Sequence, residues 1–372
     1  MNQYLQQSPQ SLRPRWYHAQ LDVPLVIGLM ILSISGLIIL YSAGHANPMK
    51  VMRQGIHLLI GCIALFLLAR VPPDRYRFWS PWLFGSGVLL LSAVLMSGII
   101  GKGAQRWLYL GLFQFQPSEL MKLLVPMILA WYLHNRSLPP TPSECFLLLG
   151  LILLPAWLVA KQPDLGTALL IIASGTSVLL LAGIRARIMI GSFLLVIGSI
   201  PVVWHHLHAY QQQRVLTFIH PEQDPLGKGY HIIQSKIAIG SGGMLGKGWL
   251  QGSQSHLQFL PEESTDFIFA VFSEEFGLVG ALGLISLYLW IAIRGLSTSL
   301  QGQDTFSRLF AGALSLNFFM AVFVNIAMVS SILPVVGVPL PFISYGGTSL
   351  ITWAAGFGMI ISIRNHRRLL ES

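Results

Sequence analysis

Charged residues are scarce in this chain of 372 residues, in which aspartate, glutamate, lysine and arginine together make up 10%. Soluble globular domains contain about 25% of these residues. Hydrophobic residues make up 53% of the sequence, and a helix that crosses a bilayer needs about 20 predominantly apolar residues. The shortage of charge therefore excludes most soluble folds and intrinsic disorder, and it indicates a membrane protein with many spans.

Cysteine is also rare, because the chain contains only Cys62 and Cys145, each inside an apolar run. Two such residues supply neither a disulfide framework nor a cysteine-based metal site. We therefore interpret both as small hydrophobic side chains within spans, and we predict no metal site from them.

Apolar runs recur along the whole chain and predict about ten transmembrane helices. The predicted spans are residues 23–43, 55–69, 81–100, 119–134, 144–160, 165–183, 188–204, 267–293, 309–332 and 346–363. We expect an all-α polytopic membrane protein that forms one integral membrane domain over residues 1–372.

The distribution of cations predicts the orientation of the chain. An even number of spans places both termini on one side, and arginine is abundant in the short loops of that side. The short loops of the other side hold only Lys50, Arg53, Lys102, Arg106 and Lys161. By the positive-inside rule we expect residues 1–22 and 364–372 in the cytoplasm. The net charge of +9 then reflects topology and not nucleic-acid binding.

One predicted outer loop, residues 205–265 between the seventh and eighth spans, is much longer than the others. It contains no apolar run long enough to cross a bilayer. Tyr230, Trp249 and Phe259 argue against disorder, and long segments in compact proteins are usually functional. We therefore expect a large ordered extracytoplasmic loop.

A few charged residues lie within or at the outer ends of the spans, where such groups usually face a protein interior or a water-filled cavity. Glu119 and Lys122 are three residues apart on one helix face, as expected for either a structural ion pair or a cavity wall. Asp164, at the outer start of the sixth span, either caps that helix or lines the same cavity.

Asp266 lies where the long outer loop enters the eighth span. A carboxylate between an aqueous loop and an apolar helix is placed to act as a general base. Capping of that helix is the alternative, although Glu262, Ser264 and Thr265 could cap it instead. Glu274 lies about 12 Å deeper along the helix and is too far away to form a carboxylate pair with Asp266.

Six outer segments carry motifs in a recognisable order. They are GAQRWL (103–108), FQPSE (115–119), QPDLGT (162–167), GYHIIQSKIAIGSGG (229–243), TDFIFA (265–270) and PLPFISYGG (339–347). Together these motifs closely resemble the SEDS family (shape, elongation, division and sporulation), and within it the rod-shape members more than the division members.

The resemblance implies a ten-helix enzyme of the bacterial cytoplasmic membrane. Such an enzyme polymerises lipid II into peptidoglycan glycan strands at the outer face of the membrane during cell elongation. It implies a class B penicillin-binding protein (a transpeptidase) as partner, together with other proteins of the elongation complex. The family's catalytic carboxylate falls on Asp266, and its cavity positions fall on Arg53, Arg106, Glu119, Lys122 and Asp164.

Lipid II carries its sugar on a pyrophosphate, which leaves as a stable anion, so the main requirement is a base for the acceptor hydroxyl. We expect Asp266 to be this base, while Arg106, Arg53 or Lys122 stabilises the departing pyrophosphate. A divalent cation, Mg²⁺ or Mn²⁺, could share that role, but the sequence identifies no ligands for it. The alternative function is a lipid II flippase, because many helices with buried charges also suit transport. The position of the charged motifs at the outer ends favours the enzyme.

Overall fold

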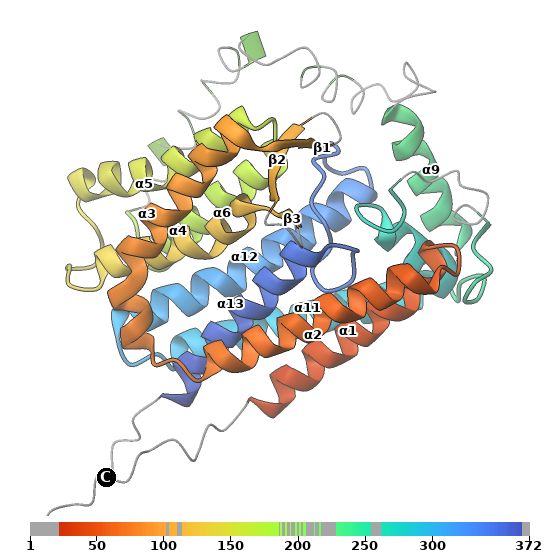
Figure 1. Cartoon of the computed structure of the whole chain (residues 1–372), viewed down its shortest axis with the longest axis horizontal. Coiled ribbons are helices and arrows are strands. Elements are labelled where there is room, and N and C mark those ends of the chain that lie inside the picture. Colours follow the sequence, from red (N-terminus) through yellow and green to blue (C-terminus); the bar gives the residue numbers. More distant parts are fainter. Residues whose placement is uncertain are drawn as a thin grey trace, which may run out of the picture.

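The computed structural model describes residues 22–101, 104–109, 114–185, 228–253 and 262–366, together with isolated positions between 187 and 216. Helices dominate the described part (Figure 1). They are α1 (Val23–Ala43), α2 (Pro48–Ala69), α3 (Pro73–Ser97), α4 (Pro117–Leu133), α5 (Pro142–Lys161), α6 (Leu165–Leu181), α9 (Lys228–Ser241), α11 (Ile268–Leu300), α12 (Thr305–Val329) and α13 (Gly347–Asn365). A small antiparallel sheet, ordered β1-β2-β3, lies between α3 and α4 in the chain and contains β1 (Ile99–Gly101), β2 (Ala104–Tyr109) and β3 (Gln114–Phe115).

Local signals explain where several of the helices begin. Proline occupies the first turn of α1 to α5, where its missing N–H costs no hydrogen bond. The side chains of Asp22 and Asn47 cap α1 and α2. Thr141 and Glu144 form a reciprocal capping box at the start of α5.

Where the structure describes them, the predicted spans overlap helices, although span 81–100 ends within β1 and span 309–332 runs past the end of α12. Six of the described helices, namely α1, α2, α3, α5, α11 and α12, are long and apolar enough to cross a membrane. Helices α2 and α3 begin at Pro48 and Pro73, earlier than predicted. Their first turns contain polar residues, and the prediction was based on apolar runs. The seventh predicted span, residues 188–204, falls mostly outside the described residues, so the total of ten stays a prediction.

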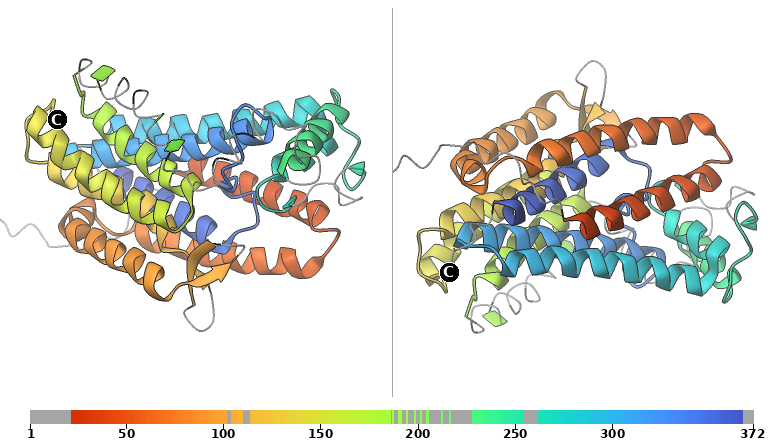
Figure 2. Two further views of the ribbon diagram at one scale, coloured as in Figure 1. Left: turned by 90° about the horizontal axis from the view of Figure 1, so that it is seen from above. Right: turned by 90° about the horizontal axis from the view of Figure 1, so that it is seen from below.

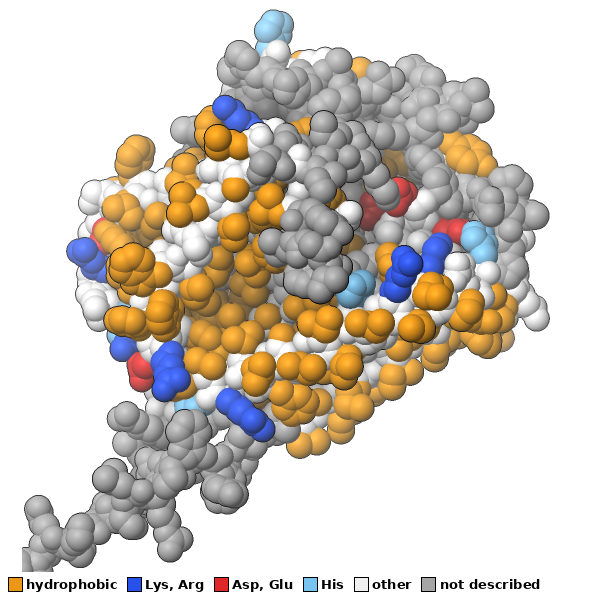
Figure 3. All heavy atoms as spheres, viewed as in Figure 1, with side chains coloured by type: hydrophobic (Ala, Val, Ile, Leu, Met, Phe, Trp, Pro, Cys, Tyr) orange, Lys and Arg blue, Asp and Glu red, His pale blue; other side chains and the backbone are white. Residues whose placement is uncertain are grey.

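The helices form one bundle with α12 near its centre, where it contacts α4, α6 and α11 (Figures 1 and 2). The ring of Phe318 on α12 contacts those of Tyr288, Phe342, Trp353 and Phe357, mostly edge-on or tilted. Aromatic pairs of this kind contribute about 0.5–1.5 kcal/mol beyond the area that they bury. Large hydrophobic side chains cover the outside of α1 and α2 along the lower flank in Figure 3, as expected for a surface in contact with lipid.

One end of the bundle carries a cluster of ion pairs. The buried carboxylate of Asp22 accepts hydrogen bonds from Arg294, whose Nη2 lies 2.9 Å away, and from Arg364. Asp304 pairs with Arg77 at 3.7 Å and lies near His134. The contacts of Asp22 join the start of α1 to the second half of α11 and the end of α13. They lie at the end that the distribution of cations predicts to be cytoplasmic.

Part of the long predicted loop is ordered, since it contains α9 and the segment 242–253, which packs against α11. Residues 254–261 and most of 206–227 lie outside the described residues. Figure 2 shows α9 at the end of the bundle opposite to the end of α13. The position of the whole loop relative to a membrane stays a prediction.

The segment 242–253 packs against a break in α11. Gly277 has φ 64° and ψ −165°, a conformation that is essentially restricted to glycine. The N–H groups of Lys247 and Gly248 donate to the carbonyls of Glu274 and Glu275, each at 3.0 Å. On the other side of the break, the N–H groups of Leu278 and Val279 donate to the carbonyls of Gly243 and Met244 at 2.9 and 3.1 Å. The segment therefore replaces the helical hydrogen bonds that the break removes.

We expect Gly277→Ala to destabilise the protein. A Cβ at this position would lie 2.3 Å from the backbone nitrogen of Gly246, and the backbone conformation alone costs a residue with a side chain about 1–3 kcal/mol. Thermal melting of the purified variant should show a clear fall in melting temperature. Gly283→Ala is the matched control on the same helix, because no atom lies within 4 Å of its added Cβ. An unchanged melting temperature for Gly277→Ala would contradict the role of the break.

The predicted orientation is testable with exposed positions at the two ends of the bundle. In a variant that lacks Cys62 and Cys145, we expect Ser253→Cys to react with a membrane-impermeant maleimide in cells with a permeabilised outer barrier. Gln301→Cys, at the opposite end, should react only after the cells are lysed. The reverse pattern would place the turn that contains Asp266 on the cytoplasmic side.

Candidate active site

Asp266 lies in a turn formed by residues 262–267, directly before α11, and its side chain is partly exposed. The N-cap residue of α11 is Phe267, whose side chain makes no capping hydrogen bond. The hydroxyl of Thr265 closes the turn by donating to the carboxylate of Glu262 at 2.8 Å. Asp266 therefore does not occupy the capping position, and a chemical role for its carboxylate stays a prediction.

The turn is fixed by the loop of residues 333–346, which joins α12 to α13. The hydroxyl of Ser344 donates to the carbonyl of Thr265 at 2.5 Å. The N–H of Tyr345 donates to the carbonyl of Ser264 at 2.8 Å. Two consecutive residues of the loop thus bind the two residues that precede Asp266.

A buried glutamine on α2 fixes this loop in turn. Gln54, which is 1% exposed, donates to the carbonyl of Ser344 at 3.1 Å and accepts from the N–H of Gly346 at 3.3 Å. Arg53, the preceding residue, is exposed near the N-terminal end of α2. The structure therefore places Arg53 beside the residue that connects α2, through this loop, to the turn of Asp266.

Asn325 on α12 binds the turn from the other side. Its side-chain nitrogen donates to the carbonyls of Asp266 and Val338, at 3.0 and 2.7 Å. Gly337 has a positive φ of 74°, and a Cβ there would lie 3.4 Å from Oδ2 of Asp266. The loop therefore passes directly beside the carboxylate.

Arg106, Gln116 and Asp164 form a second group of polar side chains. Asp164 caps α6 by accepting from the N–H of Thr167 at 3.3 Å, so the capping interpretation of this residue is confirmed. Its carboxylate also accepts from Gln116 at 3.2 Å and lies 3.7 Å from Nε of Arg106, whose Nη2 donates to the carbonyl of Pro163. Burial raises the pKa of the Asp164 carboxyl, and the Arg106 guanidinium opposes this shift.

Glu119 and Lys122, on the first turns of α4, form the ion pair that their spacing predicts. Their charged atoms lie 2.7 Å apart, and the two residues are 3% and 2% exposed. The Lys122 ammonium also lies 5.2 Å from the ring centre of Trp353. Removing one partner of a buried pair usually costs about 3–5 kcal/mol. The pair is thus part of the structure, and direct contact with a substrate stays a prediction.

The loop of residues 333–346 joins these groups. Gly166, two residues after Asp164, packs so closely on the loop that a Cβ would lie 2.4 Å from the carbonyl oxygen of Val336. Gly337, which follows Val336 in the loop, faces Asp266. The structure therefore brings Asp266 and the group around Asp164 to opposite sides of one short stretch of loop. Among the described residues, no three His, Cys, Asp or Glu side chains gather in a metal-binding arrangement.

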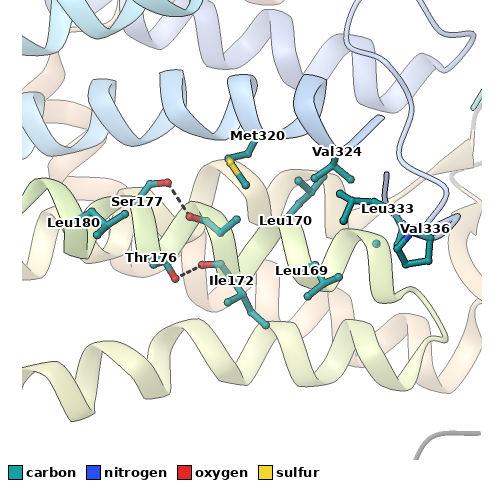
Figure 4. Close-up of a pocket in the computed structure, with 13 residues that line it drawn as sticks. Leu169, Leu170, Ile172, Thr176, Ser177, Leu180, Met320, Val324, Leu333 and Val336 are labelled. Atoms are coloured by element: carbon teal, nitrogen blue, oxygen red, sulfur yellow. Dashed lines mark hydrogen bonds between the residues drawn. The ribbon is translucent and has the colours of Figure 1, made fainter. Parts of the chain in front are cut away.

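An apolar groove of about 430 Å³ runs along α6 and α12 and ends at this loop (Figure 4). The hydroxyls of Thr176 and Ser177 in its wall donate to carbonyls of their own helix, each at 2.8 Å. The remaining lining is hydrophobic, and Val336 lies at the end of the groove nearest to Gly337. The groove therefore has the chemistry to receive an apolar chain beside the candidate site.

A further ionisable group, which the sequence analysis did not single out, lies at the same end of the bundle as Asp266. Oε1 of Glu263 is 2.5 Å from Nε2 of His45. Burial raises the pKa of Glu263 to about 7, and Lys50 opposes this shift. Near neutral pH this carboxyl therefore gains or loses a proton readily. The only sequence signal was the position of Glu263 three residues before Asp266.

Comparison with known proteins places the chain in a family. A family model described as "Cell cycle protein", which groups FtsW, RodA and SpoVE, matches residues 16–369. The chain is 48% identical over 357 residues to the peptidoglycan glycosyltransferase MrdB of Escherichia coli (strain K12), with 96% of each chain covered.

Solved structures agree with this assignment. One similar chain comes from a study of how a peptidoglycan synthase complex coordinates polymerization and crosslinking; it is 34% identical, has a TM-score of 0.83, and covers 94% of this chain and 98% of that one. The rod shape determining protein RodA of Thermus thermophilus is 29% identical with a TM-score of 0.72, over 96% of this chain and all of that one. Because the match extends over nearly the whole chain in both sequence and fold, the protein belongs to the SEDS family of cell cycle proteins.

Proposed function

We infer that this chain is a peptidoglycan glycosyltransferase that polymerises lipid II into glycan strands during cell elongation and rod-shape maintenance. The observation that carries this inference is the match over nearly the whole chain to MrdB, which is named a peptidoglycan glycosyltransferase. The turn of Asp266 supports it, since α12 and the loop of residues 333–346 bind the backbone of this turn, and α2 binds that loop. A flippase would not require a carboxylate fixed in this way.

We propose that Asp266 is the general base. It removes the proton from the acceptor sugar hydroxyl, and the hydroxyl oxygen then forms a bond to the anomeric carbon of the donor. The bond between that carbon and the pyrophosphate oxygen breaks, and the lipid pyrophosphate leaves as an anion that needs no added proton. A positioned base contributes about 10²–10⁴-fold to such a step.

Arg106 and Arg53 are the cations that we propose bind the pyrophosphate. The side chain of Arg106 is 25% exposed, and Arg53 is exposed at the outer end of α2. A guanidinium matches two phosphate oxygens with two parallel hydrogen bonds. Lys122 is buried against Glu119. We propose that this pair and Asp164 shape the site, and that the Lys122 ammonium stabilises the negative charge of the pyrophosphate from behind.

The apolar groove between α6 and α12 supports a substrate with a lipid tail, because it ends beside the loop that carries Gly337. We propose that any Mg²⁺ or Mn²⁺ arrives with the substrate pyrophosphate. Mg²⁺ is commonly held by one or two carboxylates together with substrate phosphates.

We propose that the enzyme works in the bacterial cytoplasmic membrane with both termini in the cytoplasm and with its site at the outer face. A class B penicillin-binding protein is the proposed partner, because the similar chain with TM-score 0.83 belongs to a peptidoglycan synthase complex. Other elongation proteins are expected to join them. The clustering of Arg106, Asp164 and Asp266 at one end of the bundle agrees with a reaction at one membrane face.

Asp266→Asn should nearly abolish polymerisation, with a loss of about 10²-fold or more, because an amide cannot accept the proton. The variant preserves side-chain size and should retain its melting temperature. The measurement is a gel assay of glycan polymer made from purified lipid II by the purified protein. If the folded variant polymerises within a few-fold of wild type, the base must be sought at Asp164 or Glu119.

Arg106→Lys should lower polymerisation at least about tenfold, since lysine keeps the charge but loses the paired hydrogen bonds of a guanidinium. The loss should appear mainly in kcat/KM for lipid II, measured in the same assay. Arg136→Lys, at the opposite end of the bundle, is the control and should retain wild-type activity. Full activity in Arg106→Lys would show that only charge is required at this position.

A further inference from the structure

Two asparagines on α12, Asn317 and Asn325, are completely buried in a largely apolar helix. Each donates a side-chain hydrogen bond to a backbone carbonyl of another element. Asn317 binds the carbonyl of Lys122 on α4 at 3.0 Å, and Asn325 binds the carbonyl of Asp266 at 3.0 Å. Both acceptors belong to residues of the candidate site, although the donors are remote from them in sequence.

The bond from Asn317 replaces one that the helix cannot make. In a regular helix the carbonyl of Lys122 would accept from the N–H four residues later, but that residue is Pro126, which has none. The amide nitrogen of Asn317 supplies the missing donor. The backbone of α4 at Lys122 is therefore fixed by α12 and not by its own helical ladder.

The bond from Asn325 acts at a similar irregularity. The carbonyl of Asp266 lies in a turn before α11, and the N–H of Ala270, which would reach it in a continuing helix, donates instead to Phe267 at 2.9 Å. Asn325 binds the carbonyl of Asp266 and also that of Val338, next to Gly337. One side chain thus joins the turn of the base to the loop that passes its carboxylate.

The two side chains satisfy backbone carbonyls, but they also carry a cost to stability. Within the described part of the chain, neither side-chain oxygen, Oδ1 of Asn317 or Oδ1 of Asn325, has a hydrogen-bond partner. A buried polar atom without a partner destabilises a protein, and a half-satisfied group is worse than an apolar one. Each side-chain nitrogen, by contrast, donates to the backbone of a site residue, and that of Asn325 donates to Val338 as well.

We propose that Asn317 and Asn325 are positioning residues, by which α12 sets the distance between Asp266 and the Glu119–Lys122 ion pair. The two asparagines are eight residues apart, which corresponds to about 12 Å along the helix. Each acts on the backbone of another residue and does not touch the substrate. The assignment of their effects to two halves of the site rests on the proposed glycosyltransferase function.

The test compares Asn325→Leu with Asn317→Leu in steady-state polymerisation of lipid II by the purified full-length protein. Asn325→Leu should lower kcat at least about tenfold and change KM less than about threefold, because a small misplacement of a base slows the chemical step. Asn317→Leu should mainly raise KM, by at least about fivefold, because it displaces the charged pair near the pyrophosphate site. With a purely structural role, the two variants would not differ in which of kcat and KM they change.

Ser315→Ala is the matched control, since it removes a buried hydrogen bond from α12 that stays within that helix, to the carbonyl of Ala311 at 2.8 Å. Its kcat and KM should stay within about twofold of wild type. Equal effects of the two asparagine variants on kcat and KM, or the same losses in Ser315→Ala, would overturn the proposal. If Asn325→Leu does not fold, Asn325→Ser, which retains one donor, should show a smaller loss confined to kcat, and an unchanged kcat overturns the proposal.

Hydrogen–deuterium exchange separates this proposal from the proposed function. Amides of residues 262–270 should exchange faster in Asn325→Leu than in wild type and Asn317→Leu, whether or not the protein makes polymer. Absence of polymer from the wild-type protein would count against the glycosyltransferase and leave this result intact. Unchanged exchange in Asn325→Leu would overturn the positioning role even in an active enzyme.

Discussion

The structure depends on one constraint, namely that backbone N–H and carbonyl groups inside an apolar bundle must find partners within the protein. Regular helices meet this requirement by themselves, but α4 contains Pro126 and α11 is broken at Gly277. At both places the missing bonds come from remote parts of the chain. Asn317 supplies a donor to α4, and the segment 242–253 supplies donors and acceptors to α11. These substitutions fix the relative positions of helices that apolar contacts alone would leave free to slide.

The candidate site lies where the helical ladders stop. The turn of residues 262–267 and the loop of residues 333–346 contribute most of its backbone, and irregular backbone in membrane proteins is tolerated where it is buried in protein or lines a cavity. Ser344, Gln54 and Asn325 provide the hydrogen bonds that hold this backbone around Asp266. A carboxylate on a turn held from three directions combines exposure to a substrate with a fixed position, which base catalysis needs.

The sequence predicted several local features of the site correctly. The spacing of Glu119 and Lys122 predicted a shared helix face, and the structure contains the ion pair. The position of Asp164 predicted a cap, which is present together with contacts to Arg106 and Gln116. The sequence analysis missed Gln54 because its partners lie about 290 residues later in the chain, and no local sequence pattern predicts such a contact.

Most of the spans, the cap by Asp164 and the family motifs followed from the sequence by itself, because hydropathy, helical periodicity and capping act over a few residues. The tertiary structure decided which element completes each interrupted helix and what surrounds Asp266. Asn325 and Asp266 are 59 residues apart in the chain, and nothing local identifies them as partners. Their bond satisfies a buried amide and a carbonyl outside the helical ladder, and only the packing of α12 against the loop and the start of α11 brings them within reach.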